Sequence, residues 1–326
     1  MERGIFEAVR PIDSQSWALS TFLPPHGGGP LILAATNNGV YQLNDNKAVL
    51  IKETDARYLL ASKADPARVY VASMDGLSSI RYVDGRWRDQ GAIQGLTKQI
   101  DYLAEDGGGN LWAAERYGTL VRLHSQQITR FDTSSGLPHL DHLSIYSLAN
   151  GLVFNTALGH YRFDSTQQRF IPDSRYGGRA SLVEDPHGNI WMGRYGTQKA
   201  LDILLKHADG SYEADSVSLK RFDQIPEVSV ILPQSDGVAW IGAGKVLFRY
   251  DYRRKVEHPE PYQAMVRRVA AGRDSAIYYG TKAEGAGETP ALPYRSNSLQ
   301  FDFAAPYFIH AEGTQFSHLL EGYDPT

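Results

Sequence analysis

The stretch LAEDGGGNLW, from Leu103 to Trp112, recurs as LVEDPHGNIW, from Leu182 to Trp191. In each copy an apolar segment leads into a turn made of Asp, Gly and Asn, and a second apolar segment carrying Trp follows. Asp and Asn bond to their own backbone in tight turns, and Gly supplies the positive φ that such turns need. The apolar-polar alternation on either side is typical of half-buried strands. The stretch therefore predicts a β-hairpin that repeats along the chain.

A weaker form of the same pattern runs through the sequence: a large apolar residue, small residues, then Gly and another strand. Seven anchor residues follow it: Leu33, Tyr70, Trp112, Phe154, Trp191, Trp240 and Tyr278. The distance from the first anchor to the last, divided over six intervals, is about 41 residues, within the ~40–50 residues of a four-stranded propeller blade. A blade cannot bury both its faces alone, so blades must stack into a ring. We expect an all-β fold, with a seven-bladed β-propeller over residues 1–289.

The third repeat shows the parts of one blade. Alternation predicts strands over residues 100–105, 110–115, 119–124 and 127–131. The outer strands of the last blade are not evident, and the N-terminal segment 5–12 offers one that would clasp the ring.

Residues 290–326 differ in character. Leu299, Phe301 and Phe303 alternate with polar or small residues, which indicates a strand. Fewer than ~40 residues rarely fold as an independent domain. We expect this segment to be the beginning of a β-sandwich that is incomplete here.

Composition narrows the function classes. The 326 residues are 42% hydrophobic and 11% aromatic, which is typical of a globular protein. Lys and Arg total 33 against 37 Asp and Glu, a formal charge of −4 without a basic block, so we expect no nucleic-acid partner. The sequence has no apolar run of the ~18–20 residues that a membrane helix needs. It also has no Cys, which fits an oxidising compartment, although cytosolic chains can lack Cys too.

These features resemble a known family. The segments 105–112 and 184–193 are similar to the I-x-x-I-x-E-D-x-x-G-N-x-W-x-G-T repeat of two-component regulator propellers, and 133–138 (TSSGLP) resembles the connection between their blades. The segments 292–306 and 320–324 are similar to the first half of the triple-tyrosine sandwich that follows such propellers.

The resemblance implies the periplasmic sensor of an inner-membrane receptor, whose output module is commonly a histidine kinase and sometimes a diguanylate cyclase. As partners we expect a small molecule or an oligosaccharide, and a second copy of the chain in a homodimeric full-length receptor. The signal and membrane segments, and the output module, would lie outside this chain. We therefore expect no catalytic residue and no cofactor here.

The sequence gives little indication of catalytic or metal-binding motifs. The turn 106–110 lacks the Asp-x-Asp spacing and distal Glu of a calcium loop, so a turn role is favoured. The two His of 139–142 (HLDH) are a weak zinc pattern, and a solvated loop is favoured. The anchors Trp112, Trp191 and Trp240 are expected to pack between blades rather than to stack on sugars. We expect no metal site.

Topology predicts where a ligand would bind. Because strands alternate in direction, the turns between the second and third strands of each blade and the links between blades emerge on one face. The triplet Arg-Tyr-Gly occurs there twice; Arg grips carboxylate or sulfate and Tyr offers a stacking face, which suits an acidic oligosaccharide. The alternative is that these residues cap the channel or form a dimer surface. The candidate residues are Asn38, Asp75, Arg116, Tyr117, Arg194, Tyr195, His139, Arg175 and Tyr176.

The sequence therefore favours an extracytoplasmic sensing or interaction module. A propeller scaffold that mediates dimerisation or binds protein partners is the alternative. A propeller lyase or glycosidase is disfavoured, because no motif places a base beside a charge-neutralising group.

Overall fold

The computed structural model describes residues 7–138, 143–194, 200–215, 219, 222, 225, 227–254, 263–272, 275–280, 291–296, 298–305 and 315–319. The chain forms two compact units, Met1–Tyr252 and Arg253–Thr326. Apart from short 3-10 turns, the described elements are all strands. In this part of the chain no helix is long and apolar enough to cross a membrane.

The described residues of the first unit form six antiparallel sheets, here called blades one to six. Blade one contains β1 (Ser16–Phe22), β2 (Leu31–Thr36), β3 (Gly39–Asn44) and β4 (Lys47–Lys52), and blade two contains β5 (Ala56–Ala61), β6 (Arg68–Ser73), β7 (Gly76–Val83) and β8 (Arg86–Ala92). Blade three contains β9 (Ile100–Glu105), β10 (Leu111–Glu115), β11 (Thr119–His124) and β12 (Gln127–Phe131), and blade four contains β13 (Ser144–Leu148), β14 (Gly151–Thr156), β15 (Gly159–Asp164) and β16 (Arg169–Pro172). Blade five contains β17 (Ala180–Glu184), β18 (Ile190–Arg194), β19 (Leu201–Lys206) and β20 (Tyr212–Ala214), and blade six contains β21 (Val230–Pro233), β22 (Val238–Ala243) and β23 (Val246–Asp251).

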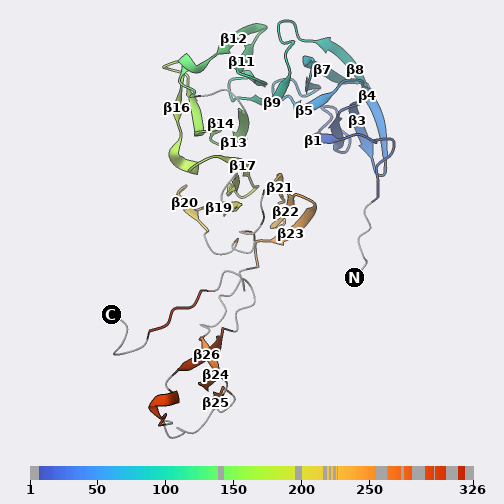
Figure 1. Ribbon diagram of the computed structural model, residues 1–326. Coiled ribbons are helices and arrows are strands. Elements are labelled where there is room, and N and C mark those ends of the chain that lie inside the picture. Colours follow the sequence, from blue (N-terminus) through green and yellow to red (C-terminus); the bar gives the residue numbers. More distant parts are fainter. Residues whose placement is uncertain are drawn as a thin grey trace. The chain divides into compact units, whose positions relative to one another are not determined.

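Each blade is a meander in which consecutive strands pair. In Figure 1 the six blades follow one another in an arc, with the first strand of each blade innermost. The inner strands β1, β5, β9, β13, β17 and β21 contact one another in chain order. The strand prediction for blade three is confirmed to within one residue, since β10 begins at Leu111 rather than Asn110.

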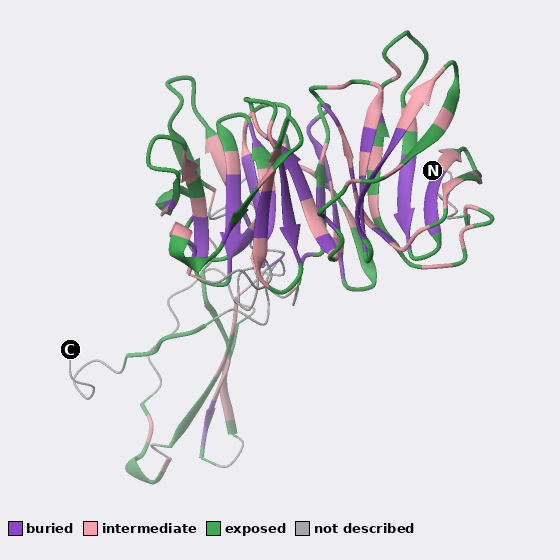
Figure 2. Cartoon of the chain, turned by 90° about the horizontal axis from the view of Figure 1, so that it is seen from above, coloured by how far each residue is buried: buried purple, intermediate pink, exposed green. Residues whose placement is uncertain are grey.

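The hydrophobic core lies between the blades. The buried side chains gather in five clusters, one between each pair of consecutive blades, which Figure 2 shows as purple strand segments. Period-two alternation produces this arrangement: on β10, Trp112 and Ala114 face blade four, whereas Leu111 and Ala113 face blade two. The rings of Trp112 and Phe154, the anchors of two consecutive blades, meet edge to face at 5.2 Å.

The Asp of the repeat organises its own hairpin. Asp106 accepts the indole N–H of Trp112 at 2.8 Å through Oδ2, and its Oδ1 accepts the backbone N–H of Asn110 at 2.9 Å. Asp185 does the same in blade five, with Trp191 at 3.2 Å. The turn prediction is confirmed, and the carboxylate also explains why Trp follows six residues later: its indole N–H would otherwise be buried without a partner.

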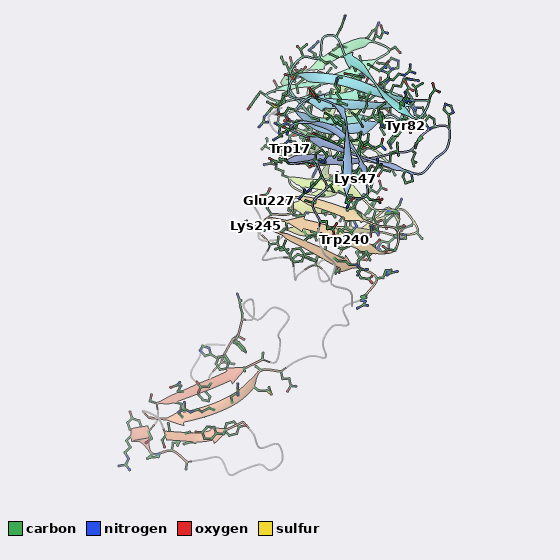
Figure 3. The ribbon with its side chains drawn as sticks, turned by 90° about the vertical axis from the view of Figure 1, so that its right-hand side faces the viewer. Trp17, Lys47, Tyr82, Glu227, Trp240 and Lys245 are labelled. Atoms are coloured by element: carbon green, nitrogen blue, oxygen red, sulfur yellow. The ribbon has the colours of Figure 1, made fainter. Side chains whose placement is uncertain are left out.

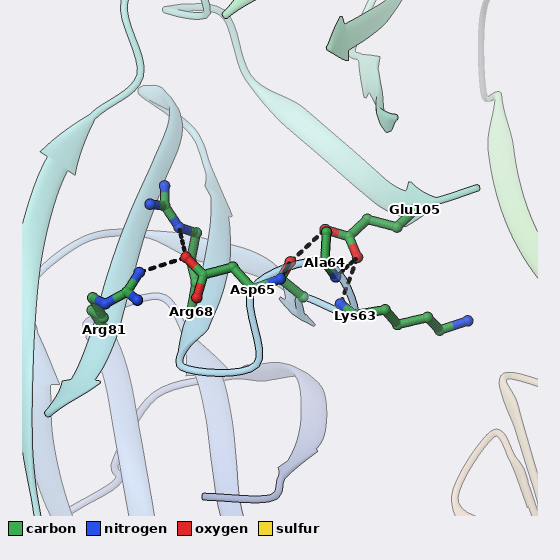
Figure 4. A network of polar contacts seen from close by, with 7 residues as sticks. Lys63, Ala64, Asp65, Arg68, Arg81 and Glu105 are labelled. Atoms are coloured by element: carbon green, nitrogen blue, oxygen red, sulfur yellow. Dashed lines mark hydrogen bonds and ion pairs between the residues drawn. The ribbon is translucent and has the colours of Figure 1, made fainter. Parts of the chain in front are cut away.

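The Glu that precedes this Asp connects blades. Glu105 is buried, and its carboxylate reaches the turn between β5 and β6 of blade two (Figure 4). It accepts the hydroxyl of Ser62 at 2.6 Å and the backbone N–H groups of Lys63 and Ala64 at 2.5 and 3.3 Å. Glu105 therefore binds the preceding blade, whereas Asp106 binds the turn of its own hairpin.

Trp240 departs from the expectation for the anchors. Trp112 and Trp191 are buried between blades as predicted, but Trp240 is only half-buried. It lies on the last blade of the first unit, labelled in Figure 3, and its indole N–H donates to Gln234 at 3.3 Å.

The second unit contains one described sheet, in the order β25 (Ser275–Tyr279), β24 (Met265–Ala271), β26 (Leu299–Ala304). The sequence placed β24 and β25 in a seventh blade and β26 in the sandwich, with a boundary at 289/290. β24 instead pairs with β26 along its length, from Met265–Ala304 to Ala271–Leu299, so one sheet spans that boundary. The count of seven blades is not confirmed and stays a prediction, and the 320–324 motif lies outside the described residues.

The described part of the N-terminal segment lies against blade one. Arg10 forms a parallel bridge to Lys47 on β4 of blade one, and its carbonyl accepts the N–H of Ala48 at 2.8 Å. The outer edge of a sheet carries unpaired backbone groups, and this segment satisfies some of those of blade one. The structure therefore shows this segment beside the outer strand of blade one, and its role as an outer strand of the last blade stays a prediction.

Candidate functional site

Inner strands of four blades, together with the link to blade five, line a cavity of about 720 Å³. Its walls come from the first residues of β1, β5, β9 and β13, from the end of β14, from the turn after β10 and from the link before β17. The lining residues are Trp17, Ala18, Arg57, Tyr58, Asp101, Tyr102, Arg116, Tyr117, Leu143, Ser144, Asn155 and Arg179. Here it is called the channel pocket. It lies at the face where the second-to-third-strand turns and the links between blades emerge, which is the face that the topology argument predicted.

Two predicted residues, Arg116 and Tyr117, line this pocket. Both are exposed, Tyr117 to 83%. The Arg116 backbone N–H donates to the Gln99 carbonyl at 2.9 Å, and its guanidinium lies 5.4 Å from the centre of the Tyr117 ring. Tyr117 has a φ of 67°, a left-handed conformation that favours Gly. The turn thus holds an Arg and an aromatic face together at the rim of the pocket.

The second triplet behaves differently. The Arg194 guanidinium forms an ion pair with Asp202 on β19, a buried residue, and its backbone N–H donates to Ala200 at 2.9 Å. Arg194 does not line the channel pocket. Tyr195 lies outside the described residues.

Arg175 and Tyr176 belong to the 3-10 turn η2 (Ser174–Tyr176) in the link to blade five. Arg175 is held by Asp173 through two hydrogen bonds of 2.8 and 2.6 Å. Tyr176 is buried in the core between blades four and five, where Asn150 donates to its hydroxyl at 3.3 Å. Burial leaves the Tyr176 ring no free face for a ligand.

Asn38 and Asp75 lie in exposed turns on the predicted face, but neither lines the pocket. Asn38 donates through its side chain to Asp13 at 3.2 Å, and the Asp75 backbone N–H donates to the hydroxyl of Ser73 at 3.3 Å. His139 lies outside the described residues.

Most residues of the pocket lie on inner strands, whereas the candidates predicted from the sequence were all expected in turns and links. Arg57 and Tyr58 begin β5, and Asp101 and Tyr102 occupy the same positions on β9. In both strands a buried apolar residue is followed by a charged residue and then by Tyr. This recurring pattern at the start of the inner strands is the signal that could have identified them.

The aromatic and basic groups of the pocket are stacked. The Arg57 guanidinium lies 4.2 Å from the centre of the Trp17 ring and donates to Asp55 at 3.1 Å. The rings of Tyr58 and Tyr102, from neighbouring blades, lie 5.8 Å apart. Burial, together with the nearby Tyr102, raises the pKa of Tyr58 above its ordinary value, so its hydroxyl stays protonated and can donate.

One buried His among the described residues does not line the channel pocket. His160 on β15 is buried, and burial lowers its pKa although the Ala180 and Gly177 carbonyls oppose this shift. No group of three His, Cys, Asp or Glu that could hold a metal ion occurs among the described residues. A second cavity of about 600 Å³ lies between blades two and three. Its Asp65 and Arg68 pair with each other at 3.1 Å, so its charges are largely satisfied internally (Figure 4).

The sequence matches no protein-family model and no curated protein. Solved structures show a clear likeness. The extracellular domain of a hybrid two-component system of B. thetaiotaomicron superposes with a TM-score of 0.57 at 16% identity, over 89% of this chain and 41% of the other. The extracellular domain of a one-component system of the same organism gives a TM-score of 0.56 at 17% identity, over 79% and 34%.

A virginiamycin B lyase of Staphylococcus aureus is also similar, with a TM-score of 0.50 at 11% identity over 76% of this chain and 88% of the lyase. At these identities the likeness concerns the fold and not the chemistry. The chain spans less than half the length of these two extracellular domains. By its fold, the chain is an all-β, propeller-like protein similar to the extracellular domains of such signalling systems.

Proposed function

We propose that the chain is an extracytoplasmic ligand-sensing module of a bacterial signal-transduction receptor, and that its ligand binds in the channel pocket. The observation that carries the proposal is the lining of this pocket by residues from blades one to four and from the link to blade five. A ligand there would contact several inner strands at once, so its binding would be coupled to the arrangement of the blades.

The size and chemistry of the pocket support this role. A volume of about 720 Å³ lies within the ~300–1,000 Å³ of small-molecule sites, and aromatic side chains combined with a few polar groups are typical of their walls. The fold likeness to extracellular domains of signalling systems supports the location and the sensing role. The periplasmic site, the kinase or cyclase output and a homodimeric receptor are parts of the same proposal.

A thermal-shift screen of the full chain against a library of mono- and oligosaccharides and small metabolites tests the proposal. A ligand present at 100 times its Kd adds about 2.7 kcal/mol to the free energy of unfolding, which raises Tm by several degrees. The pocket is tested with Tyr117→Ala. The matched control is Tyr294→Ala in the second unit, because Tyr294 is also exposed, to 89%.

A compound that stabilises the wild type and the control, but not Tyr117→Ala, supports the proposal. Compounds that stabilise all three proteins equally, or a library with no stabilising compound, contradict it and direct attention to the scaffold function instead.

A further inference from the structure

The cavity between blades two and three, here called the inter-blade cavity, is separate from the channel pocket. Its volume is about 600 Å³, and its lining comes from the turns β5–β6, β9–β10 and β11–β12, from the adjoining strand ends and from the link after β8. The two cavities share no lining residue. A volume of this size lies within the ~300–1,000 Å³ of small-molecule sites.

An ion pair with unused hydrogen-bonding groups lines the inter-blade cavity (Figure 4). Oδ2 of Asp65 accepts the Nε–H of Arg68 at 3.1 Å and the Nη1–H of Arg81 at 2.5 Å. Among the described residues, Oδ1 of Asp65 and the two Nη groups of Arg68 have no hydrogen-bond partner. The pair therefore offers an acceptor oxygen and N–H donors of opposite charge side by side.

The charges around the cavity are balanced. Glu105, the other carboxylate of the lining, is buried and accepts three hydrogen bonds from the β5–β6 turn. Together with Arg81, the lining thus combines two carboxylates with two guanidinium groups. Burial raises the pKa of Asp65, but hydrogen bonds from Arg81 and Arg68 outweigh burial and hold this pKa below its ordinary value, so the carboxylate stays ionised. A ligand with one charge of each sign preserves this balance, whereas a simple anion or cation disturbs it.

The other walls are apolar or neutral. Ile93, Leu111 and Leu123 line the cavity with aliphatic side chains. The Tyr70 ring lies 5.8 Å from the Arg68 guanidinium, and burial raises the pKa of Tyr70, so its hydroxyl stays protonated and can donate. An apolar surface thus lies beside the charged pair.

The β11–β12 turn holds a strained residue at this cavity. Ser125 and Gln126 have φ values of 45° and 73°, and both line the cavity. The corresponding turn of blade two has Asp84 and Gly85 at φ values of 52° and 76°. Asp-Gly is a preferred pair for such turns, because Gly adopts positive φ freely. A non-Gly residue in this conformation is typical of ligand-binding sites, so we attribute the retention of Gln126 to its side-chain amide.

We infer that the inter-blade cavity is a second binding site, and that it takes a free α-amino acid with an apolar side chain. The α-carboxylate binds the Nη groups of Arg68, and the α-ammonium group binds Oδ1 of Asp65. The two charged groups of an α-amino acid are joined through one carbon, which matches the adjacent charges of this pair. The ligand's side chain lies against the aliphatic wall, and the Gln126 amide hydrogen-bonds to its polar end.

Titration calorimetry of the full chain with L-leucine, N-acetyl-L-leucine and L-leucinamide tests this inference. The first analogue lacks the ammonium group and the second lacks the carboxylate. The variants are Arg68→Gln and Gln126→Gly. Arg81→Gln is the matched control, because Arg81 also pairs with Asp65 and has a similar exposed fraction, 35% against 31%, but does not line the cavity.

L-leucine should bind at least tenfold more tightly than either analogue, since each analogue loses one charge-assisted interaction. Arg68→Gln should weaken L-leucine binding about tenfold, whereas Arg81→Gln should bind within twofold of the wild type. Gln126→Gly should weaken binding severalfold without lowering the urea midpoint, because it relieves the strained turn. Tyr117→Ala, which alters the channel pocket, should bind L-leucine as the wild type does.

Equal binding of L-leucine and its two analogues would overturn the inference, and so would equal losses in Arg68→Gln and Arg81→Gln. A lower urea midpoint in Gln126→Gly with unchanged binding would assign Gln126 a structural role and contradict its part in the site. Absence of L-leucine binding would also overturn the inference, and the proposed function would stand or fall separately through the library screen and Tyr117→Ala.

Discussion

Blades three and five have the same turn but differ on both sides of it. After the Trp, the triplet Arg-Tyr-Gly begins four residues beyond Trp112 but three residues beyond Trp191. Side chains alternate along a strand, so this shift of one residue changes the face on which the Arg lies. Arg116 reaches the channel pocket, whereas Arg194 lies at the position of Glu115 and pairs with Asp202. An identical triplet is therefore not a repeated site, because its register against the anchor decides its surroundings.

Before the turn, the two blades differ in how they connect to the preceding blade. Glu105 makes three hydrogen bonds to blade two and is buried. Glu184 is half-buried, and its recorded bond is one from the Ala149 N–H at 2.5 Å. The same sequence position therefore contributes unequally to the two interfaces.

The largest effect should come from this position. Glu105→Ala removes three hydrogen bonds to a charged acceptor, one of them from the buried Ser62, so we expect a loss of about 3 kcal/mol in the free energy of unfolding. Glu184→Ala should lose about 1 kcal/mol. Urea unfolding of both variants beside the wild type measures the difference, and equal losses would show that the two blades are connected alike.

The next largest effect is a difference in the free energy of unfolding between variants of Arg194 and Arg116. Arg194→Gln removes the charged partner of the buried Asp202, and we expect a loss of about 2 kcal/mol, below the ~3–5 kcal/mol of a fully buried pair because Arg194 is partly exposed. Arg116→Gln should stay within about 0.5 kcal/mol, as exposed substitutions usually do. Urea midpoints give both values. A loss in Arg116→Gln as large as that in Arg194→Gln would refute the difference in environment.

Much of the fold follows from local signals. The four strands of blade three are predictable because alternation and the Asp/Asn/Gly turn are encoded within a few residues, and each of the seven anchors lies on the second strand of its sheet. The pairing of β24 with β26 was not predictable. Alternation at Leu299, Phe301 and Phe303 indicates a strand, but its partner lies about 30 residues away and is chosen by packing.

The site was predictable only in part. The face predicted from strand direction holds a cavity, and the predicted Arg116 and Tyr117 line it; that a ligand binds there stays a prediction. Tyr176 was a candidate but is buried, since position in a link says nothing about burial. Arg57 and Tyr102 were missed, because a polar residue on an inner strand looks like any half-buried position until the blades are placed around a channel.

The shared turn can be tested through its titration. Burial raises the pKa of Asp106, but hydrogen bonds from Trp112 and Asn110 outweigh burial and hold this pKa below its ordinary value. The unfolded chain therefore binds more protons, so this contribution to stability is complete above the unfolded Asp pKa of about 3.9 and is lost as pH falls through the lower folded value. Asp106→Asn should cost about 1.5 kcal/mol at pH 7 through the altered hydrogen bonds, and less at low pH.

Urea unfolding from pH 7 down to the lowest pH at which the protein stays folded gives this profile. Asp84→Asn is the control, because the Asp84 side chain is 88% exposed, and its profile should follow that of the wild type. Parallel profiles for the wild type and Asp106→Asn would show that the carboxylate is not stabilised by its turn.

The smallest effect concerns the backbone of Tyr117, the residue that gives the blade-three triplet its function in our proposal. At a φ of 67° a Cβ is unfavourable, whereas Gly adopts this conformation freely. The greater entropy of Gly in the unfolded chain offsets part of this gain, so Tyr117→Gly should be more stable than Tyr117→Ala by about 0.5 kcal/mol.

Both variants should lose ligand binding in the channel pocket, since both lack the ring. If Tyr117→Gly is more stable than Tyr117→Ala but binds the ligand more weakly than the wild type, the Tyr117 ring serves binding rather than stability. A loss of more than 1 kcal/mol in Tyr117→Gly would instead show that the exposed ring stabilises blade three, and the contrast with the structural role of Arg194 would disappear.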